Sequence, residues 1–477
     1  MSVVLAVIAP AAAFGQSSGA VWDPVTGTLP AARGGAPADV RPDSYRAFTL
    51  DQSALSDGLD NAPKVGLRAN TLSKGATTLT LPAPGGGFQR FDVQESPIME
   101  PGLAARHPEI KTYAGVGVDD PAATIRADNS PAGFHASVRS PHGAWYTDPY
   151  YHLDDSVYVS YYGRDLVGNS HGTFVERDGE TDSDPLDLGA LDVPPGLEIK
   201  LRTYRLALVT DPTYSTFLGG PANVTAAKVT LMNRVDQVYE DEIAIRMILI
   251  ADNDELNLNS AAQMTDPNGP CGAAACYTAA QASGCAGATL ARNRIVVGQI
   301  IGASNYDIGH IMFGLNGGGV ASLGVVGGNS KAQGCTGLPT PVGDYMAVDY
   351  VAHEMGHQFG GNHTFNGTQL NCSGGNRNAA TSVEPGSGTS IMAYAGICQQ
   401  DNLQPHSDPY WSQRSFEEIT TYVTSDRPAI SEVQTGSLRD FDGTDSFTLG
   451  YRGKTTNPIV RGTNYSAAGI QTDLQGV

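Results

Sequence analysis

The sequence predicts a protein of the α/β (α+β) class, in which a β-rich N-terminal region precedes a domain with a mostly parallel, twisted sheet and a central helix. Three observations lead to this prediction. Segments of residues 77–199 alternate apolar and polar side chains between Gly and Pro, as strands do. Residues 199–430 pass from strand to helix and back, which indicates a largely parallel sheet. In that second region, one helix has few polar residues on any side, so it is expected to be central.

Length and composition limit the classes of function. The 477 residues are enough for two or three domains with a sizeable core. Only 16% of residues are charged and the net charge is −20, which argues against nucleic acid or an anionic membrane as a partner. The acidic balance can equally be a plain solubility feature. The 57 Gly and 29 Pro predict many turns, at a level below that of a disordered chain.

The first sixteen residues are uncharged and apolar, and they are too short to span a bilayer, which takes about 20 residues. They resemble the apolar and small-residue regions of a secretory signal peptide. We therefore expect a signal peptide over residues 1–18 and a secreted protein without a transmembrane helix. The first basic residue is Arg33, so the positive start of a signal peptide is missing. Either the start is truncated or the assignment is wrong.

Residues 19–190 are expected to form the β-rich region, beginning with a loosely ordered leader to about residue 75. An acidic stretch with several Pro, residues 178–196, has the composition of a linker that proteases would attack. The strands predicted before it are residues 77–81, 88–93, 134–138 and 157–162.

The region from 199 to 430 is expected to form the second domain. A helical face runs over residues 227–238, residues 253–292 are expected to be a disulfide-tied insertion, and residues 294–301 fit a strand or a helix equally. Ser415 and Glu418 have the spacing of a capping box that opens a last helix to about Val423. Residues 431–477 turn β-like again, as the start of a further module that is cut short. The predicted strands are residues 204–210, 243–250, 306–313 and 320–326.

The six Cys all lie from residue 271 onward, and an even number in an exported chain predicts disulfides. Six Cys allow fifteen pairings, among which we favour Cys372–Cys398, closing the loop after the central helix. Free buried thiols are the alternative. A second metal site made of Cys is disfavoured because the sequence has no CxxC pair. The six are Cys271, Cys276, Cys285, Cys335, Cys372 and Cys398.

One stretch carries a metal-site pattern. His353 and His357 are four residues apart, so on a helix they share a face and can point at one ion. Glu354 lies beside that face, where it can act as a general base. Gly360 permits a left-handed exit from the helix, and the turned chain brings back His363. Three neutral imidazoles leave a fourth tetrahedral position for water, which is typical of a catalytic zinc site.

The helix that carries this pattern is expected to begin at Asp344, whose carboxylate is a plausible N-cap. Met346 and Tyr350 continue the face on which His353 and His357 lie. The alternative is a buried helix whose His residues only form hydrogen bonds inside a core. That alternative would bury three His and a Glu with no metal to satisfy them.

The same pattern, followed by Ser390-Ile-Met392-Ala-Tyr394, resembles the metzincin clan of zinc endopeptidases, in which a methionine turn lies beneath the metal. Met392 matches that methionine and is expected to be a packing residue. The resemblance covers about residues 199–430, and the segment before it resembles a pro-region. It implies a metzincin-type fold around a central zinc helix.

Within the clan, three further segments are similar to reprolysin-like (adamalysin-like) peptidases, specifically to the bacterial secreted group. These segments are residues 306–310, the Gly-rich strand leading to Cys335, and the run from Glu384 to Cys398. Thr364 stands where animal reprolysins have Asp, and Ala393 where their methionine turn continues to Pro. Tyr394 resembles a Tyr of astacin- and pappalysin-type enzymes that stabilises the oxyanion or touches the metal. That role and a packed aromatic remain equal alternatives.

The resemblance implies a secreted zinc-dependent endopeptidase, a hydrolase of protein or peptide substrates. One catalytic Zn²⁺ on His353, His357 and His363 activates a water, and Glu354 is the general base. We expect a monomer with no nucleic-acid or membrane partner, while calcium binding stays open. Competing readings are a secreted binding or adhesion module with a structural metal site, and a zinc hydrolase of non-peptide substrates.

The pro-region makes the chain an expected zymogen. No Cys precedes residue 271, so a thiolate from the pro-region cannot cap the metal. Inhibition would be steric, or would use a carboxylate or a His. Each upstream His is more simply an ordinary surface or loop residue. These are His107, His135, His142, His152 and His171.

Overall fold

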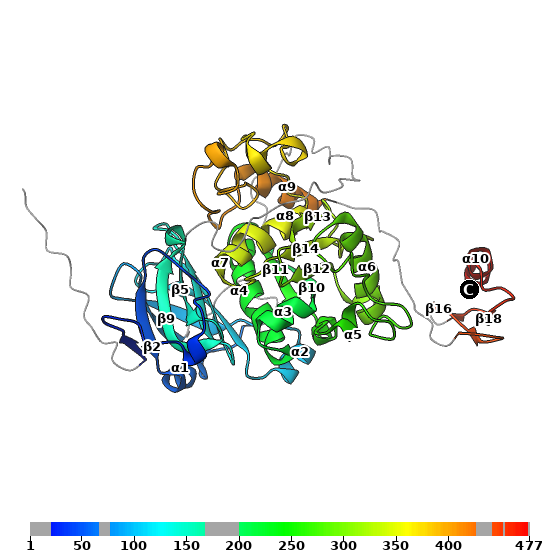
Figure 1. Ribbon diagram of the computed structural model, residues 1–477, viewed down its shortest axis with the longest axis horizontal. Coiled ribbons are helices and arrows are strands. Elements are labelled where there is room, and N and C mark those ends of the chain that lie inside the picture. The colour runs from blue at the N-terminus through cyan, green and yellow to red at the C-terminus, as the bar shows by residue number, and fades with distance from the viewer. Residues whose placement is uncertain (1–20, 66–76, 167–199, 426–440, 452–453, 476–477) are drawn as a thin grey trace, which may run out of the picture.

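The computed structural model describes residues 21–65, 77–166, 200–425, 441–451 and 454–475. Figure 1 shows a β-rich N-terminal part beside a mixed α/β part, as the pattern of apolar and polar residues predicts. We call residues 21–65 and 77–166 the N-terminal unit and residues 200–425 the central domain. The expected signal peptide and linker lie outside the described residues. No helix among those described is both long and apolar enough to cross a bilayer.

The N-terminal unit is one antiparallel sheet of nine strands in the order β1-β2-β9-β8-β7-β6-β5-β4-β3. All four strands predicted before residue 166 are present, and the short helix α1 (Gln52–Leu59) packs on the sheet, whereas α2 (Pro101–Arg106) packs into the core of the central domain. The strands are β1 (Trp22–Pro24), β2 (Arg46–Leu50), β3 (Thr77–Pro82), β4 (Phe88–Glu95), β5 (Lys111–Gly117), β6 (Thr124–Ser130), β7 (Gly133–Arg139), β8 (Trp145–Tyr151) and β9 (Asp154–Tyr162).

The expectation of a loosely ordered leader is wrong for residues 21–65. Strands β1 and β2 extend the sheet, with Trp22 and Phe48 buried in its core. The side chain of Asp51 caps α1 by accepting a hydrogen bond from the backbone of Ala54 at 3.0 Å. Strands this short bury one or two apolar side chains each, so they show no periodicity in the sequence.

The central domain has a five-stranded sheet in the order β11-β10-β12-β14-β13. The first three neighbouring pairs are parallel, and β13 is antiparallel to β14. The predicted strand over residues 320–326 is only partly present, because β13 ends at Ala321 and turns follow. The strands are β10 (Arg202–Thr210), β11 (Ile245–Leu249), β12 (Ile308–Phe313), β13 (Gly318–Ala321) and β14 (Gly334–Gly337).

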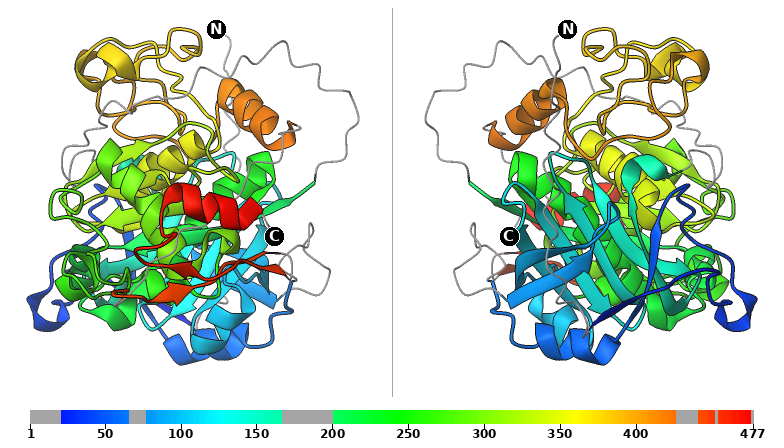
Figure 2. Two further views of the ribbon diagram at one scale, coloured as in Figure 1. Left: turned by 90° about the vertical axis from the view of Figure 1, so that its right-hand side faces the viewer. Right: turned by 90° about the vertical axis from the view of Figure 1, so that its left-hand side faces the viewer.

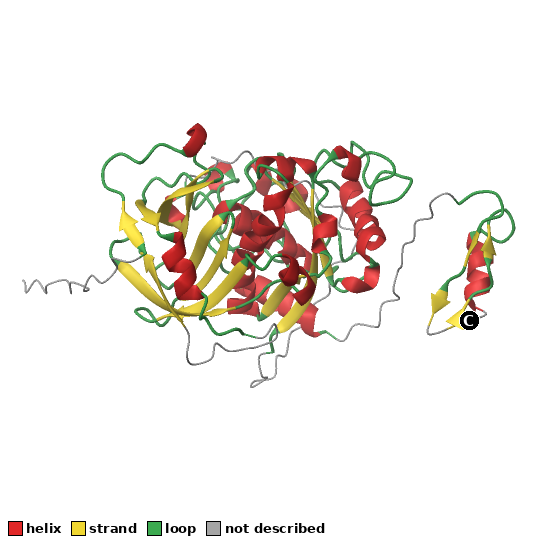
Figure 3. Ribbon diagram, turned by 90° about the horizontal axis from the view of Figure 1, so that it is seen from below, coloured by secondary structure: helices red, strands yellow, loops and turns green. Residues whose placement is uncertain are grey.

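Helices cover both faces of this sheet. Along β10, Leu206 and Leu208 pack into one apolar cluster, whereas Ala207 and Val209 pack into another, as alternate residues of a strand must. The first cluster holds α4 (Val224–Ile243) and the helix with the metal-site pattern, and the second holds α6 (Gly287–Ile301). Figures 2 and 3 show these layers from other sides. Residues 294–301, whose pattern fits a strand or a helix equally, lie within α6 and are helical. Two shorter helices are α3 (Pro212–Phe217) and α5 (Ala261–Met264).

The central helical segment runs through α7 (Gly343–Tyr345), a π-helical stretch (Met346–Ala352) and α8 (His353–Gln358). Asp344 is not its N-cap. The residue at that position is Val342, and Asp344 lies inside the helix with 2% of its surface exposed. The carboxyl group of Asp344 is instead buried near Tyr146 of β8, and burial raises its pKa.

The predicted capping box at Ser415 and Glu418 is also wrong. Helix α9 (Gln413–Thr424) begins three residues earlier, and Ser412 is its N-cap, accepting a hydrogen bond from the backbone of Ser415 at 3.1 Å. Glu418 lies inside the helix, where its carboxylate has other partners. A Ser followed by Glu three residues on is therefore not enough to place a helix start here.

All six Cys form disulfides, which excludes the alternative of free thiols. Cys372–Cys398 is present, as favoured, together with Cys271–Cys276 and Cys285–Cys335. The disulfide Cys285–Cys335 ties the segment before α6 to β14.

Beyond α9, the described residues contain short strands, as the β-like pattern predicts, and one helix that it does not predict. That residues 431–477 belong to a further module stays a prediction. The elements are β15 (Ser446–Phe447), β16 (Gly450–Tyr451), β17 (Lys454–Thr455), β18 (Ile459–Val460) and α10 (Ala467–Gln475).

The N-terminal unit packs against α4 through buried ion pairs. Arg234 of α4 pairs with Asp148 of β8, and their side chains are only 5% and 4% exposed. The hydroxyl of Tyr161 donates a hydrogen bond to the same carboxylate at 2.7 Å. On α4, Glu240 pairs with Arg126 of β6 at 2.6 Å. Buried charges of opposite sign therefore join the two units.

We expect Asp148→Asn to destabilise the protein by about 3–5 kcal/mol, because it leaves the Arg234 guanidinium buried without its counter-charge. The urea midpoint of unfolding measures the change. Asp119→Asn is the control, since its pair with Arg90 is exposed, and such pairs contribute at most about 1 kcal/mol. Equal midpoints for the two variants would contradict the importance of the buried pair.

Candidate metal centre

The three predicted ligands come together. His353 and His357 lie one turn apart at the two ends of α8, and their Nε2 atoms are 3.2 Å apart. Gly360, just beyond the helix, has φ +93°, the left-handed exit expected from the sequence. The chain then returns His363, whose Nε2 lies 3.3 Å from that of His353 and 3.0 Å from that of His357.

The other nitrogen of each imidazole faces a backbone carbonyl. The Nδ1 atoms of His353, His357 and His363 lie 2.6, 2.7 and 2.6 Å from the oxygens of Ile391, Gly361 and Asn376. A carbonyl oxygen can only accept, so each Nδ1 carries the proton and donates it. In the neutral ring, Nε2 is then left with a lone pair.

Three lone pairs that face one another at 3.0–3.3 Å cannot form hydrogen bonds among themselves. They are suited to a shared cation, and rings oriented by a second hydrogen bond at Nδ1 are the usual state of metal-ligating His. His353 and His357 are 1% and 7% exposed, and His363 is partly buried. The donor set of three nitrogens therefore fits a zinc ion with one position left open.

Glu354 is fully buried beside the first ligand, against β13 of the sheet. A Cβ added to Gly319 of β13 would lie 1.9 Å from Oε1 of Glu354. The carboxylate is therefore packed against the backbone of that strand, and only Gly leaves room for it. The sequence held no signal for this contact, because it joins residues 35 positions apart in the chain.

Met392 lies beneath the helix, as expected of a packing residue. A Cβ added to Gly356 of α8 would lie 2.5 Å from its sulfur. Ile391, whose carbonyl orients His353, directly precedes it. The ring of Tyr394 lies 4.6 Å from that of His363 and stacks on Phe365 at 4.4 Å. Tyr394 is thus packed beside the ligands, and a part in catalysis stays a prediction.

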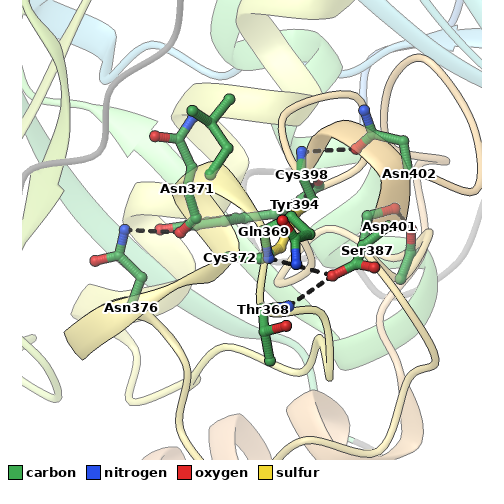
Figure 4. The surroundings of a disulfide bond; sticks show 12 residues. Thr368, Gln369, Asn371, Cys372, Asn376, Ser387, Tyr394, Cys398, Asp401 and Asn402 are labelled. Atoms are coloured by element: carbon green, nitrogen blue, oxygen red, sulfur yellow. Dashed lines mark hydrogen bonds between the residues drawn. A yellow bond between two sulfur atoms is a disulfide. The ribbon is translucent and has the colours of Figure 1, made fainter.

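The loop that orients His363 is closed by the disulfide Cys372–Cys398 (Figure 4). Asn376, whose carbonyl accepts from His363, also donates through its side chain to the carbonyl of Asn371 at 3.1 Å. Asp401 accepts from the backbone of Thr368 at 2.7 Å. The disulfide and these hydrogen bonds hold the carbonyl of Asn376 in place.

A buried polar chain anchors α8 to the sheet. Oε1 of Gln358 lies 2.9 Å from Nδ1 of His310 on β12, and Nε2 of His310 lies 2.9 Å from Oγ1 of Thr336 on β14. Burial lowers the pKa of His310 to about 4, so its ring is neutral at ordinary pH. The family resemblance includes the segment around His310, but only the structure shows that His310 links α8 to the sheet.

The upstream His residues have ordinary surroundings. Three of them contact carboxylates, those of Asp254, Asp128 and Asp39, and a fourth is exposed. His171 lies outside the described residues. The first four are, in the same order, His107, His135, His152 and His142.

We expect Zn²⁺ to raise the melting temperature of the chelator-treated protein, because a ligand that binds only the folded state stabilises it, by about 2.7 kcal/mol at 100 times its Kd. Thermal unfolding with and without added zinc measures the shift. His363→Ala should abolish it, while His142→Ala, an exposed His elsewhere, should leave it intact. A full shift in His363→Ala would show that zinc binds at another place.

Comparisons with known proteins find a matching family model and similar solved structures. The model of the reprolysin-like metallo-peptidase family M12B matches residues 221–413, which include α8 and all three His. Among solved structures, metalloproteinase-II from Bacteroides fragilis is similar, with 11% identity, a TM-score of 0.40, and 78% of this chain and 95% of that chain covered. A search of curated proteins finds no match.

The family match and the converging His residues fall on the same segment of the chain. Residues 221–413 are therefore similar to the reprolysin-like metallopeptidases of family M12B, and they contain the three His that are placed to hold the metal of such an enzyme.

Proposed function

We propose that this protein is a secreted endopeptidase in which His353, His357 and His363 hold one catalytic Zn²⁺ and Glu354 is the general base. The observation that carries the proposal is the convergence of three Nε2 lone pairs beside a buried carboxylate. When bound, zinc supplies a Lewis acid that lowers the pKa of a coordinated water towards about 7.

The residues of the chain perform the proton transfers. Glu354 takes the proton of the attacking water on its carboxylate and then delivers it to the leaving amine, so no covalent intermediate is needed. Contact with β13 limits where this carboxylate can lie. The three carbonyls that accept the Nδ1 protons keep the imidazoles oriented throughout.

A peptide substrate is supported by the place of β13. This strand is the last in the order of the five-stranded sheet, and it packs against Glu354. An extended peptide can add to such an edge through backbone hydrogen bonds, which would lay its scissile bond near the general base. A sugar or a lipid ester has no comparable way of using a strand edge.

The competing function is an adhesion module that keeps the metal for structure alone. A buried carboxylate next to the ligands disfavours it, since a structural site has no use for a base. Digestion of casein with and without a zinc chelator separates the two. Cleavage that stops with the chelator and returns with zinc supports the peptidase, and no cleavage by zinc-loaded, correctly processed protein supports the module.

Secretion is supported by the apolar first sixteen residues and by three disulfides, which persist in oxidising compartments outside the cytosol. We assign residues 19–190 as the pro-region of a zymogen. N-terminal sequencing of the active secreted form tests both assignments, because it locates the mature start.

Glu354→Gln should keep zinc but lower kcat/KM by several orders of magnitude, because the amide cannot accept the proton of the water. Zinc content and peptide hydrolysis are measured on the same sample. Glu109→Gln, at a side chain that is 48% exposed, is the control and should be fully active. Near-normal cleavage by Glu354→Gln would remove Glu354 from the mechanism.

Gly319→Ala should lower kcat/KM on the order of 10²-fold, since its Cβ would displace the carboxylate of Glu354, and a misplacement of about 1 Å can cost that much. Zinc should stay bound, because the contact is with the base and not with a ligand. Gly58→Ala, in open space on α1, is the control. Unchanged kinetics in Gly319→Ala would show that β13 does not position Glu354.

A further inference from the structure

Glu384 lies in the loop that follows the third His in the chain, on a segment that pairs with the residues just after that His. Phe365 and Glu384 form a parallel bridge, and the backbone N–H of Glu384 donates to the carbonyl of Thr364 at 2.9 Å. In the sequence, Glu384 is marked only as part of a run of family resemblance, which assigns it no role.

The carboxylate of Glu384 accepts four hydrogen bonds. Its Oε1 accepts from the backbone of Thr389 at 3.0 Å and from the backbone of Ser390 at 3.1 Å. Its Oε2 accepts from Oγ of Ser390 at 2.5 Å and from Oγ1 of Thr364. A carboxylate only accepts, so it matches a surrounding of four donors.

The donors belong to the two segments that orient metal ligands. Thr364 directly follows His363, and its backbone N–H donates to the carbonyl of Met392 at 3.0 Å. Ser390 directly precedes Ile391, whose carbonyl accepts the Nδ1 proton of His353 at 2.6 Å. One carboxylate therefore links the segment after the third ligand to the segment that orients the first.

We propose that Glu384 is a positioning residue for the zinc site: it clamps Thr364 to Ser390 and so holds His363 and His353 at the spacing that one ion requires. The inference rests on the proposed function of the three His residues. Animal reprolysins have Asp where this chain has Thr364. Here the hydroxyl of Thr364 donates to the carboxylate of Glu384, which lies twenty residues further along the chain.

Glu384→Gln is the informative change, because it keeps the size of the side chain and replaces one acceptor oxygen by an NH₂ donor. If the NH₂ group faces the backbone N–H groups of Thr389 and Ser390, donor meets donor. If it faces the hydroxyls of Thr364 and Ser390, these must turn to accept, and in either case the negative charge that strengthens all four hydrogen bonds is lost. The segments can relax apart only by moving a ligand or the carbonyl that orients it. Residues that support metal ligands in this way typically change metal affinity 10–100-fold when mutated.

The test is the zinc dissociation constant of the folded full-length protein, measured by competition with a chelator. We expect Glu384→Gln to raise it about 10–100-fold. Thr364→Val and Ser390→Ala each remove one donor and should raise it less. Thr364→Val should have no further effect in the Glu384→Gln background, since the carboxylate it would bind has gone.

Co²⁺ in place of zinc adds a spectroscopic readout. Its visible absorption depends on coordination geometry, so it should change in Glu384→Gln if the ligands shift. Glu240→Gln is the matched control: Glu240 of α4 is a largely buried carboxylate that pairs with Arg126 of β6 and Arg246 of β11. It should lower stability and leave zinc affinity and the Co²⁺ spectrum unchanged.

Unchanged zinc affinity in Glu384→Gln would overturn the proposal, as would an equal loss in Glu240→Gln. If Glu384→Gln does not fold, Thr364→Val and Ser390→Ala decide, and unchanged affinity in both overturns it. A wild-type protein that takes up no zinc would instead contradict the proposed function, so the two failures are distinguishable.

Discussion

The site depends on three hydrogen bonds from imidazole Nδ1 atoms to backbone carbonyls. They fix the tautomer of His353, His357 and His363 and turn three lone pairs towards a common point. Without them, the three rings, whose Nε2 atoms lie 3.0–3.3 Å apart, could relieve the repulsion of these lone pairs by rotating away. The arrangement therefore carries an electrostatic cost that a bound cation removes, which couples metal binding to the order of the loops.

The three carbonyls come from separate places in the chain. Gly361 belongs to the turn after α8, Asn376 to the loop closed by Cys372–Cys398, and Ile391 to the segment that leads into Met392. A spacing of four residues brings two His together on any helix, but the third ligand and all three orientations need this tertiary framework. The disulfide and the carboxylate of Glu384 are two of the links that hold this framework together.

Local patterns allowed the convergence of the three His residues and many of the strands to be predicted. His353, His357, Gly360 and His363 act through short spacings on one helix and its exit, and these are visible in the sequence. The roles of Gly319 and Glu384 arise from contacts between segments far apart in the chain, for which a single sequence has no signal.

Two local patterns led to wrong predictions, because the side chains on which they depend make tertiary contacts instead. Asp344 has the right type for an N-cap, but the structure buries it beside Tyr146 of the N-terminal unit. Glu418 has the right spacing for a capping box, but it accepts from the backbone of Asn362 at 2.8 Å, next to the third ligand. The early strands β1 and β2 were missed because they are too short to show a period.

A crystal structure of the zinc-loaded protein, with anomalous diffraction collected at the zinc absorption edge, would locate the metal. We expect a single peak about 2.0–2.1 Å from the Nε2 atoms of His353, His357 and His363, with each Nδ1 still bonded to its carbonyl. A peak elsewhere, or ligation through an Nδ1 atom, would contradict this expectation.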